Sequence, residues 1–204
     1  MLNMKIKNMT SSHLRRQVLG FIFGILAFQN IYADITKTIS PETQLIEWKL
    51  IENNLELKLI QRLPDQTRSF FEARNFPKDI TNDIANSCVF QTITRNNSKD
   101  TNQSIHVSLK KWLIKIGPKT QPLKLKETWE KEWKNSSLSS ASKLAFRWAT
   151  FPTEQSFEPN GDYNWGMISF GPKPGTTFDL YIEWKINKQT KNIWLKNLIC
   201  PKNR

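Results

Sequence analysis

The stretch Phe178-Asp-Leu-Tyr-Ile-Glu-Trp-Lys-Ile186 alternates apolar and polar side chains without a break. Successive side chains of a strand point to opposite faces, so this pattern predicts a strand with one buried face. A polar turn at Asn187–Thr190 leads into a second strand over 193–200. Residues 165–170 form an earlier strand, joined to the first by a turn at 171–175 that is rich in Gly and Pro. The three strands are predicted to form an antiparallel meander.

The same two-residue alternation recurs along the rest of the chain. Residues 46–50 and 55–59 are separated by Asn53-Asn54, a turn signal, and therefore predict a hairpin. At Lys110-Lys111 the apolar phase shifts by one residue, which indicates a bulge or a bend. Further strands are predicted over residues 87–94, 105–109, 112–116 and 144–148.

Helical spacing is confined to short segments. Leu125, Trp129 and Trp133 recur every four residues and predict a helix that ends in the serines of 136–140. A second helix is predicted over 78–86, and residues 66–75 favour a short helix over a strand. Short strands with few helices and no alternating strand–helix rhythm predict a mainly β chain. We expect an antiparallel β-sandwich, immunoglobulin-like or jelly-roll-like, with one or two short helices in its loops.

Residues 1–33 have the pattern of a signal peptide. Four Lys and Arg precede an apolar run at 18–28, and no acidic residue occurs before Asp34. A run of about 11 residues is too short to span a bilayer, which needs about 20. Ile31-Tyr-Ala33 predicts cleavage after Ala33. An uncleaved anchor and a twin-arginine signal are the alternatives. The chain is then periplasmic or secreted, with a flexible leader at 34–44, one domain over 45–204, and no transmembrane segment in the mature part.

The mature chain is basic and rich in tryptophan. Without the four basic residues of the signal peptide, 26 Lys and Arg remain against 18 Asp and Glu, a net charge of +8. This charge favours contact with an anionic surface of the cell envelope or with an acidic envelope protein, whereas nucleic acid is not expected in this compartment. All eight Trp lie in the mature part, where large rings fill a core or form a ligand platform.

Cys88 and Cys200 are the only cysteines of the chain. An even pair in an oxidising compartment predicts a disulfide. The mature chain holds a single histidine, His106, and no C-x-x-C or glycine-rich phosphate loop. It therefore offers neither a histidine metal site nor a Ser–His–Asp arrangement, and we expect no cofactor.

One segment is conspicuously free of Lys and Arg, from Trp148 to Pro172. Within it lie the residues of a candidate binding loop: Glu154, Phe157, Glu158, Asp162, Tyr163 and Trp165. Carboxylate and amide oxygens in this loop are possible Ca²⁺ ligands, although their spacing is not that of an EF-hand. The alternative is a plain β-connection that turns at Asn160-Gly161, with Phe151, Phe157 and Trp165 packed under the sheet.

These features predict an exported, non-enzymatic β-sandwich that binds another protein or assists assembly in the periplasm. A carbohydrate or cell-wall binding module is the first alternative, with Trp165 and Tyr181 as stacking candidates. A small hydrolase that works through Glu154, Glu158 and Asp162 is the second.

Overall fold

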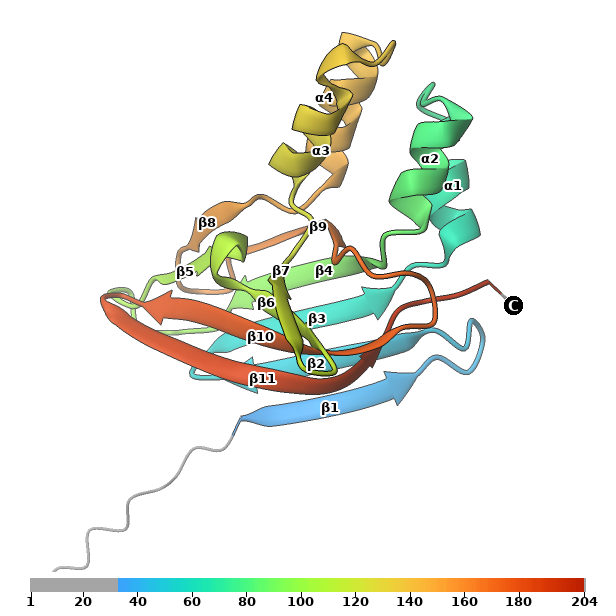
Figure 1. Ribbon diagram of the computed structural model, residues 1–204. Helices are drawn as coiled ribbons and strands as arrows, with labels where there is room; N and C mark the ends of the chain where they lie inside the picture. Colours follow the sequence, from blue (N-terminus) through green and yellow to red (C-terminus); the bar gives the residue numbers. More distant parts are fainter. Residues whose placement is uncertain (1–32, 204) are drawn as a thin grey trace, which may run out of the picture. The chain divides into compact units, whose positions relative to one another are not determined.

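Two antiparallel β-sheets pack face to face in the computed structural model, which describes residues 33–203 (Figure 1). The first sheet has the strand order β1-β2-β3-β4-β9. Its members are β1 (Asp34–Ile39), β2 (Ile46–Glu52), β3 (Leu55–Gln61), β4 (Val89–Asn96) and β9 (Tyr163–Ser169). The predicted hairpin over residues 46–59 is confirmed as β2 and β3, with Asn53 and Asn54 both at positive φ in its turn.

The second sheet is built around β10 (Thr177–Ile186). One edge of β10 pairs along its length with β11 (Gln189–Ile199), and two short strands share the other edge. The remaining strands are β5 (Ile105–Ser108), β6 (Leu113–Ile116), β7 (Lys119–Pro122) and β8 (Glu154–Phe157). The phase shift at Lys110-Lys111 is a 3₁₀ turn, η1 (Leu109–Lys111), between β5 and β6.

The core of the sandwich lies between the inner faces of the two sheets. Phe178, Leu180, Ile182 and Trp184 of β10 are at most 2% exposed, and Ile186 packs partly buried beside them. Leu57, Leu59 and Phe90 of the first sheet meet them from the other side. The mainly β class and the two packed antiparallel sheets are therefore as the alternation predicts.

Helices form a separate layer on the first sheet. They are α1 (Pro64–Glu72), α2 (Lys78–Ala85), α3 (Lys126–Glu132) and α4 (Ser140–Ala149), with a 3₁₀ turn η2 (Trp133–Asn135) after α3. Their apolar faces build a second core around Phe71, Trp133 and Phe146, which rests on Val89 of β4 and Met167 of β9. The described chain thus has four α-helices where one or two were expected, gathered on one side of the sandwich (Figure 1).

Residues 144–148, predicted as a strand, belong to helix α4. The side chain of Ser139 caps this helix by accepting a hydrogen bond from the backbone N–H of Ser142. Its buried residues, Ser142, Phe146 and Ala149, have helical spacing, and Ala, Leu, Lys and Arg are strong helix formers. The apparent alternation of Leu144, Phe146 and Trp148 was misleading because only Phe146 of the three is buried.

The predicted three-strand meander is also wrong. Residues 165–170 belong to β9, which pairs with β4 in the first sheet, so Val89 lies opposite Ser169. The turn after it crosses from one sheet to the other, so of the three predicted meander strands only β10 and β11 pair with each other. Alternation shows which residues of a strand are buried but not which neighbour the strand pairs with.

Residues 34–44 are not a loose leader. Asp34–Ile39 forms β1, which pairs with β2 in register from Asp34 opposite Ile51 to Ile39 opposite Ile46. All six residues of β1 are exposed, so burial leaves no apolar pattern to read. The predicted signal peptide lies outside the described residues apart from Ala33, and no helix within 33–203 is long and apolar enough to cross a membrane.

The predicted disulfide is confirmed. Cys88 and Cys200 are bonded, with their Cα atoms 4.9 Å apart. Cys88 immediately precedes β4 and Cys200 immediately follows β11, so the bond links one sheet to the other. Both cysteines are at most 1% exposed and belong to the sandwich core.

Candidate binding groove

Two acidic residues of the candidate loop, Glu154 and Asp162, form hydrogen bonds with nearby residues. Glu154 of β8 accepts hydrogen bonds from Lys110 at 3.1 Å and Ser108 at 3.3 Å. These contacts with Lys110, more than those with Ser108, hold the pKa of Glu154 below its usual value. Asp162 accepts from the backbone N–H of Glu158 at 2.9 Å and closes the turn between β8 and β9. Glu154 and Asp162 are therefore each held by contacts with neighbouring residues.

The turn itself has the expected form. Asn160 and Gly161 both have positive φ, the conformation that favours these residues. Phe151 and Phe157 are buried in the sandwich core, as the plain β-connection requires, whereas Trp165 is 57% exposed rather than packed under the sheet. No three His, Cys, Asp or Glu side chains of residues 33–203 form a metal-binding group.

Trp165 and Tyr163 of the candidate loop do share a surface. Both project from β9 on the outer face of the first sheet, which faces away from the sandwich core. Trp165 lies opposite Ile93 of β4, and Tyr163 lies opposite Arg95, whose guanidinium is 4.9 Å from the centre of the Tyr163 ring. Phe157 is buried, so β9 alone carries the exposed aromatic rings of this loop.

Trp165 lines a groove of about 290 Å³ together with a residue that sequence reasoning placed in a strand. This residue is Trp148 of α4, which is 78% exposed. The groove lies where the helical layer meets the first sheet, since Phe70 and Arg74 come from α1 and the turn after it, and Gln91 and Met167 are paired across β4 and β9. We call this site the Trp148–Trp165 groove.

Two arginines give the groove its charge. The guanidinium of Arg74 lies 3.5 Å from the centre of the Phe70 ring and donates a hydrogen bond to the backbone carbonyl of Phe70 at 2.7 Å. The guanidinium of Arg62 lies 5.0 Å from the centre of the same ring. Neither arginine has a carboxylate partner among the residues that the structure describes. The groove therefore concentrates positive charge beside aromatic rings.

Arg62 is the more constrained of the two arginines. Its Nε is buried and has no hydrogen-bond partner within residues 33–203. Burial, and secondly the nearby charge of Arg74, lowers the pKa of Arg62 from its usual value, although a guanidinium still carries its charge at neutral pH. Two like charges without a carboxylate partner among the described residues repel each other, and an anionic ligand group relieves this repulsion.

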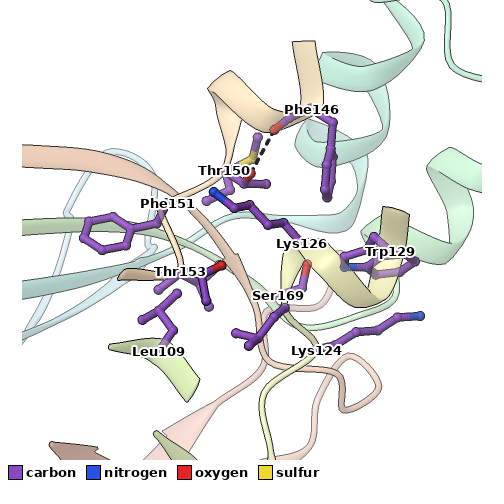
Figure 2. Close-up of a pocket in the computed structure, with 12 residues that line it drawn as sticks. Leu109, Lys124, Lys126, Trp129, Phe146, Thr150, Phe151, Thr153 and Ser169 are labelled. Carbon is purple, nitrogen blue, oxygen red and sulfur yellow. Dashed lines mark hydrogen bonds between the residues drawn. The ribbon is translucent and has the colours of Figure 1, made fainter. Parts of the chain in front are cut away.

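A second cavity lies between the helices and the sandwich, and Figure 2 shows the side chains around it. Its volume is only about 10 Å³. That is barely enough for one water molecule. Thr153 donates a hydrogen bond to Glu127 at 2.6 Å nearby and attaches α3 to the segment before β8. This small cavity therefore lies at the packed boundary between the helical layer and the sandwich.

The remaining candidates lie on the outer face of the second sheet. Tyr181 is partly buried against Trp194, with ring centres 5.3 Å apart, and its hydroxyl donates to Glu183 at 3.3 Å. His106 Nδ1 lies 3.1 Å from Ser156 Oγ, a pair formed directly across β5 and β8. Of the two stacking candidates from sequence, Trp165 faces a groove and Tyr181 lies on the other sheet.

The groove residues that sequence reasoning missed include Arg62, Phe70, Arg74 and Trp148. The helical spacing of Ser142, Phe146 and Ala149 is the signal that identifies Trp148 as solvent-facing. Comparison of the chain with protein-family models, with curated proteins and with solved structures finds no match.

Proposed function

We propose that this chain is an exported, non-enzymatic binding protein of the cell envelope that recognises another protein through the Trp148–Trp165 groove. One observation carries the proposal. Trp148 and Trp165 are 78% and 57% exposed and line one groove, although tryptophans are highly buried on average. Exposed aromatic and arginine side chains are the types that dominate protein recognition sites.

The surroundings of the acidic side chains in the candidate loop support binding over catalysis. Of the carboxylates proposed for a hydrolase, Glu154 is paired with Lys110, and Asp162 holds the backbone of Glu158. Both are exposed, whereas a carboxylate that acts as a general acid usually sits where burial raises its pKa. The proposal therefore assigns these residues to the architecture of the second sheet and its turn.

A carbohydrate module is the second candidate, and the exposure of Trp165 favours it. An indole face stacks on a sugar ring as readily as on an apolar side chain. The two candidates differ in their ligands. Titration with cell-wall fragments, followed by intrinsic tryptophan fluorescence in the wild type and in Trp165→Phe, detects the carbohydrate module.

Site-specific photo-crosslinking in intact cells tests the proposed function. A photoreactive amino acid replaces Trp148 at the groove, and the matched control replaces Trp194 on the second sheet. We expect a defined envelope-protein adduct from position 148 and none from position 194. Equal labelling from both positions, or only uncrosslinked protein from position 148, contradicts the proposal.

Export is proposed together with this function. Asp34, the first residue of the predicted mature chain, is also the first residue of β1. Intact-mass measurement of the protein from a periplasmic extract is expected to give a chain that starts at Asp34 and lacks two hydrogens because of the Cys88–Cys200 disulfide. A full-length chain retained in the cytoplasm contradicts export.

A further inference from the structure

The charge of the Trp148–Trp165 groove limits what it binds. Arg62 and Arg74 flank the groove with no carboxylate partner among the described residues, whereas Arg68 and Arg147 of the neighbouring helices are each paired with an acid. A site with two unpaired guanidinium groups selects an anionic ligand group.

Phe70 positions both arginines for this role. Its ring packs against Arg62 and Arg74, and the carbonyl of Phe70 accepts one hydrogen bond from Arg74 Nη1. Stacking and this hydrogen bond restrict the two side chains before any ligand arrives, so less conformational entropy is lost on binding. A planar carboxylate matches the fork of a guanidinium with two parallel hydrogen bonds.

The rest of the groove is apolar. Its other lining side chains are Phe70, Ala145, Trp148, Ala149, Trp165 and Met167, and Gln91 contributes the only side-chain amide. A sugar ring carries several hydroxyls that each need a donor and an acceptor, and this lining offers a single acceptor side chain, Gln91. An apolar amino-acid side chain makes no such demand. The lining therefore favours a polypeptide over a glycan.

The volume of the groove also favours a polypeptide ligand. About 290 Å³ lies just below the range of roughly 300–1,000 Å³ for small-ligand pockets. This space fits one large side chain with its flanking backbone, and the small side chains of Ala145 and Ala149 leave it open.

We propose that the Trp148–Trp165 groove binds an acidic polypeptide segment in which a carboxylate adjoins a large apolar side chain. The carboxylate binds Arg62 and Arg74, and the apolar side chain packs on the two indoles. The carboxylate belongs either to Asp or Glu or to a chain terminus, which present the same chemistry. This inference rests on the proposed function and specifies the chemistry of the partner.

Indole N–H signals in nuclear magnetic resonance test the inference on the ¹⁵N-labelled mature protein. The chain has eight Trp, and Trp148→Phe and Trp165→Phe assign the two groove signals. The probes are acetyl-Gly-Phe-Asp-Gly-amide, its Asn counterpart, and acetyl-Gly-Phe with a free or an amidated terminus. We expect the acidic probes to shift both groove signals and their neutral counterparts to bind at least about tenfold more weakly. The two acidic probes distinguish a side-chain from a terminal carboxylate.

Two variants test whether the arginines bind the carboxylate. Arg74→Gln removes an exposed charge, and Arg62→Lys keeps the charge but loses the planar fork. Both substitutions are expected to weaken the binding of the acidic probes by about tenfold. Arg147→Gln is the matched control, because it removes the same charge from α4 at a residue paired with Glu130. Unchanged binding after Arg74→Gln, equal binding of the neutral probes, or equal shifts with glucuronic acid overturns the inference.

The two proposals fail separately. If position 148 still crosslinks to its envelope protein while no acidic probe shifts either groove signal, the acidic-segment inference is overturned and the proposed function stands. If crosslinking also fails, the proposed function falls with it.

Discussion

Cys88 and Cys200 are bonded across 112 residues of sequence, and each lies directly beside a strand of a different sheet. Cys88 also has a φ of 54°, a left-handed conformation that is uncommon for a side chain of this type. The disulfide therefore holds together the end of the sandwich where β4 begins and β11 ends, and it also holds a backbone turn that local preference does not favour.

Removing this bond is expected to destabilise the protein strongly. Cys88→Ala with Cys200→Ala should lower the free energy of unfolding by about 2–5 kcal/mol, since closing a loop of this length restricts the unfolded chain. Urea denaturation of the variant and the wild type measures the difference. The reduced wild type is the control and should unfold at a similar urea concentration. A variant as stable as the oxidised wild type contradicts the prediction.

Gly166 is predicted to be irreplaceable because β9 passes very close to the chain entering β8. A Cβ at Gly166 would lie 2.4 Å from the backbone nitrogen of Phe151, which donates a hydrogen bond to Met167 in the same place. Gly166→Ala should cost about 3 kcal/mol, since backbone on both sides must move. Gly117→Ala, with φ +55° but no atom within 4 Å, should cost only about 1 kcal/mol. Thermal denaturation that ranks the two variants equally contradicts this account.

Replacing Trp148 of the groove should affect the free energy of unfolding far less than replacing Trp129 of the helical core. Trp129 is 1% exposed and packs against Trp133 with ring centres 5.4 Å apart, so Trp129→Ala should cost about 3–5 kcal/mol. Trp148→Ala should change the free energy of unfolding by less than about 0.5 kcal/mol because its ring is exposed. Chemical denaturation midpoints compare the two. A large loss at Trp148 would show that this ring stabilises the fold rather than serving a partner.

Asp179 is expected to make stability depend on acid pH. Partial burial alone raises the pKa of Asp179, but the hydrogen bonds that it accepts from Lys196 at 2.9 Å and from the backbone N–H of Asn197 at 3.0 Å outweigh burial and lower it. Its stabilising contribution is therefore present above the unfolded pKa of the carboxyl and is lost as pH falls through the folded pKa.

Asp179→Asn tests this dependence. The variant should be less stable than the wild type at neutral pH by less than about 1 kcal/mol, since the Lys196 side chain of this pair is 57% exposed and solvent screens its charge. The gap should narrow as the pH falls below about 4. Unfolding measured from pH 7 to pH 2 gives the result. A stability gap that widens in acid contradicts the assignment.

Regular alternation and composition predict much of the sandwich. β10 is identified from Phe178 to Ile186 because burial on one face alone produces a two-residue period. The pairing of Cys88 with Cys200 follows from there being two cysteines in an expected oxidising compartment. The edge strand β1 gives no such signal, since none of its residues is buried.

The candidate site is predictable only in part. Trp165 is recognisable from the sequence as a solvent-facing candidate, and the structure places it in a groove. Its partners Arg62, Arg74 and Trp148 are distant in sequence and come together because α1 and α4 share one core beneath them. A sequence pattern reports the burial of a residue along its own element, not which elements meet.

The sequence by itself therefore determined the β class, the disulfide and the buried face of β10, because each depends on local periodicity or on residue counting. Only the tertiary structure decided that β9 joins β4 and that Trp148 and Trp165 line one groove together with two arginines. Those outcomes depend on long-range packing, where the burial of Val89 and Met167 under the helices outweighs the local alternation.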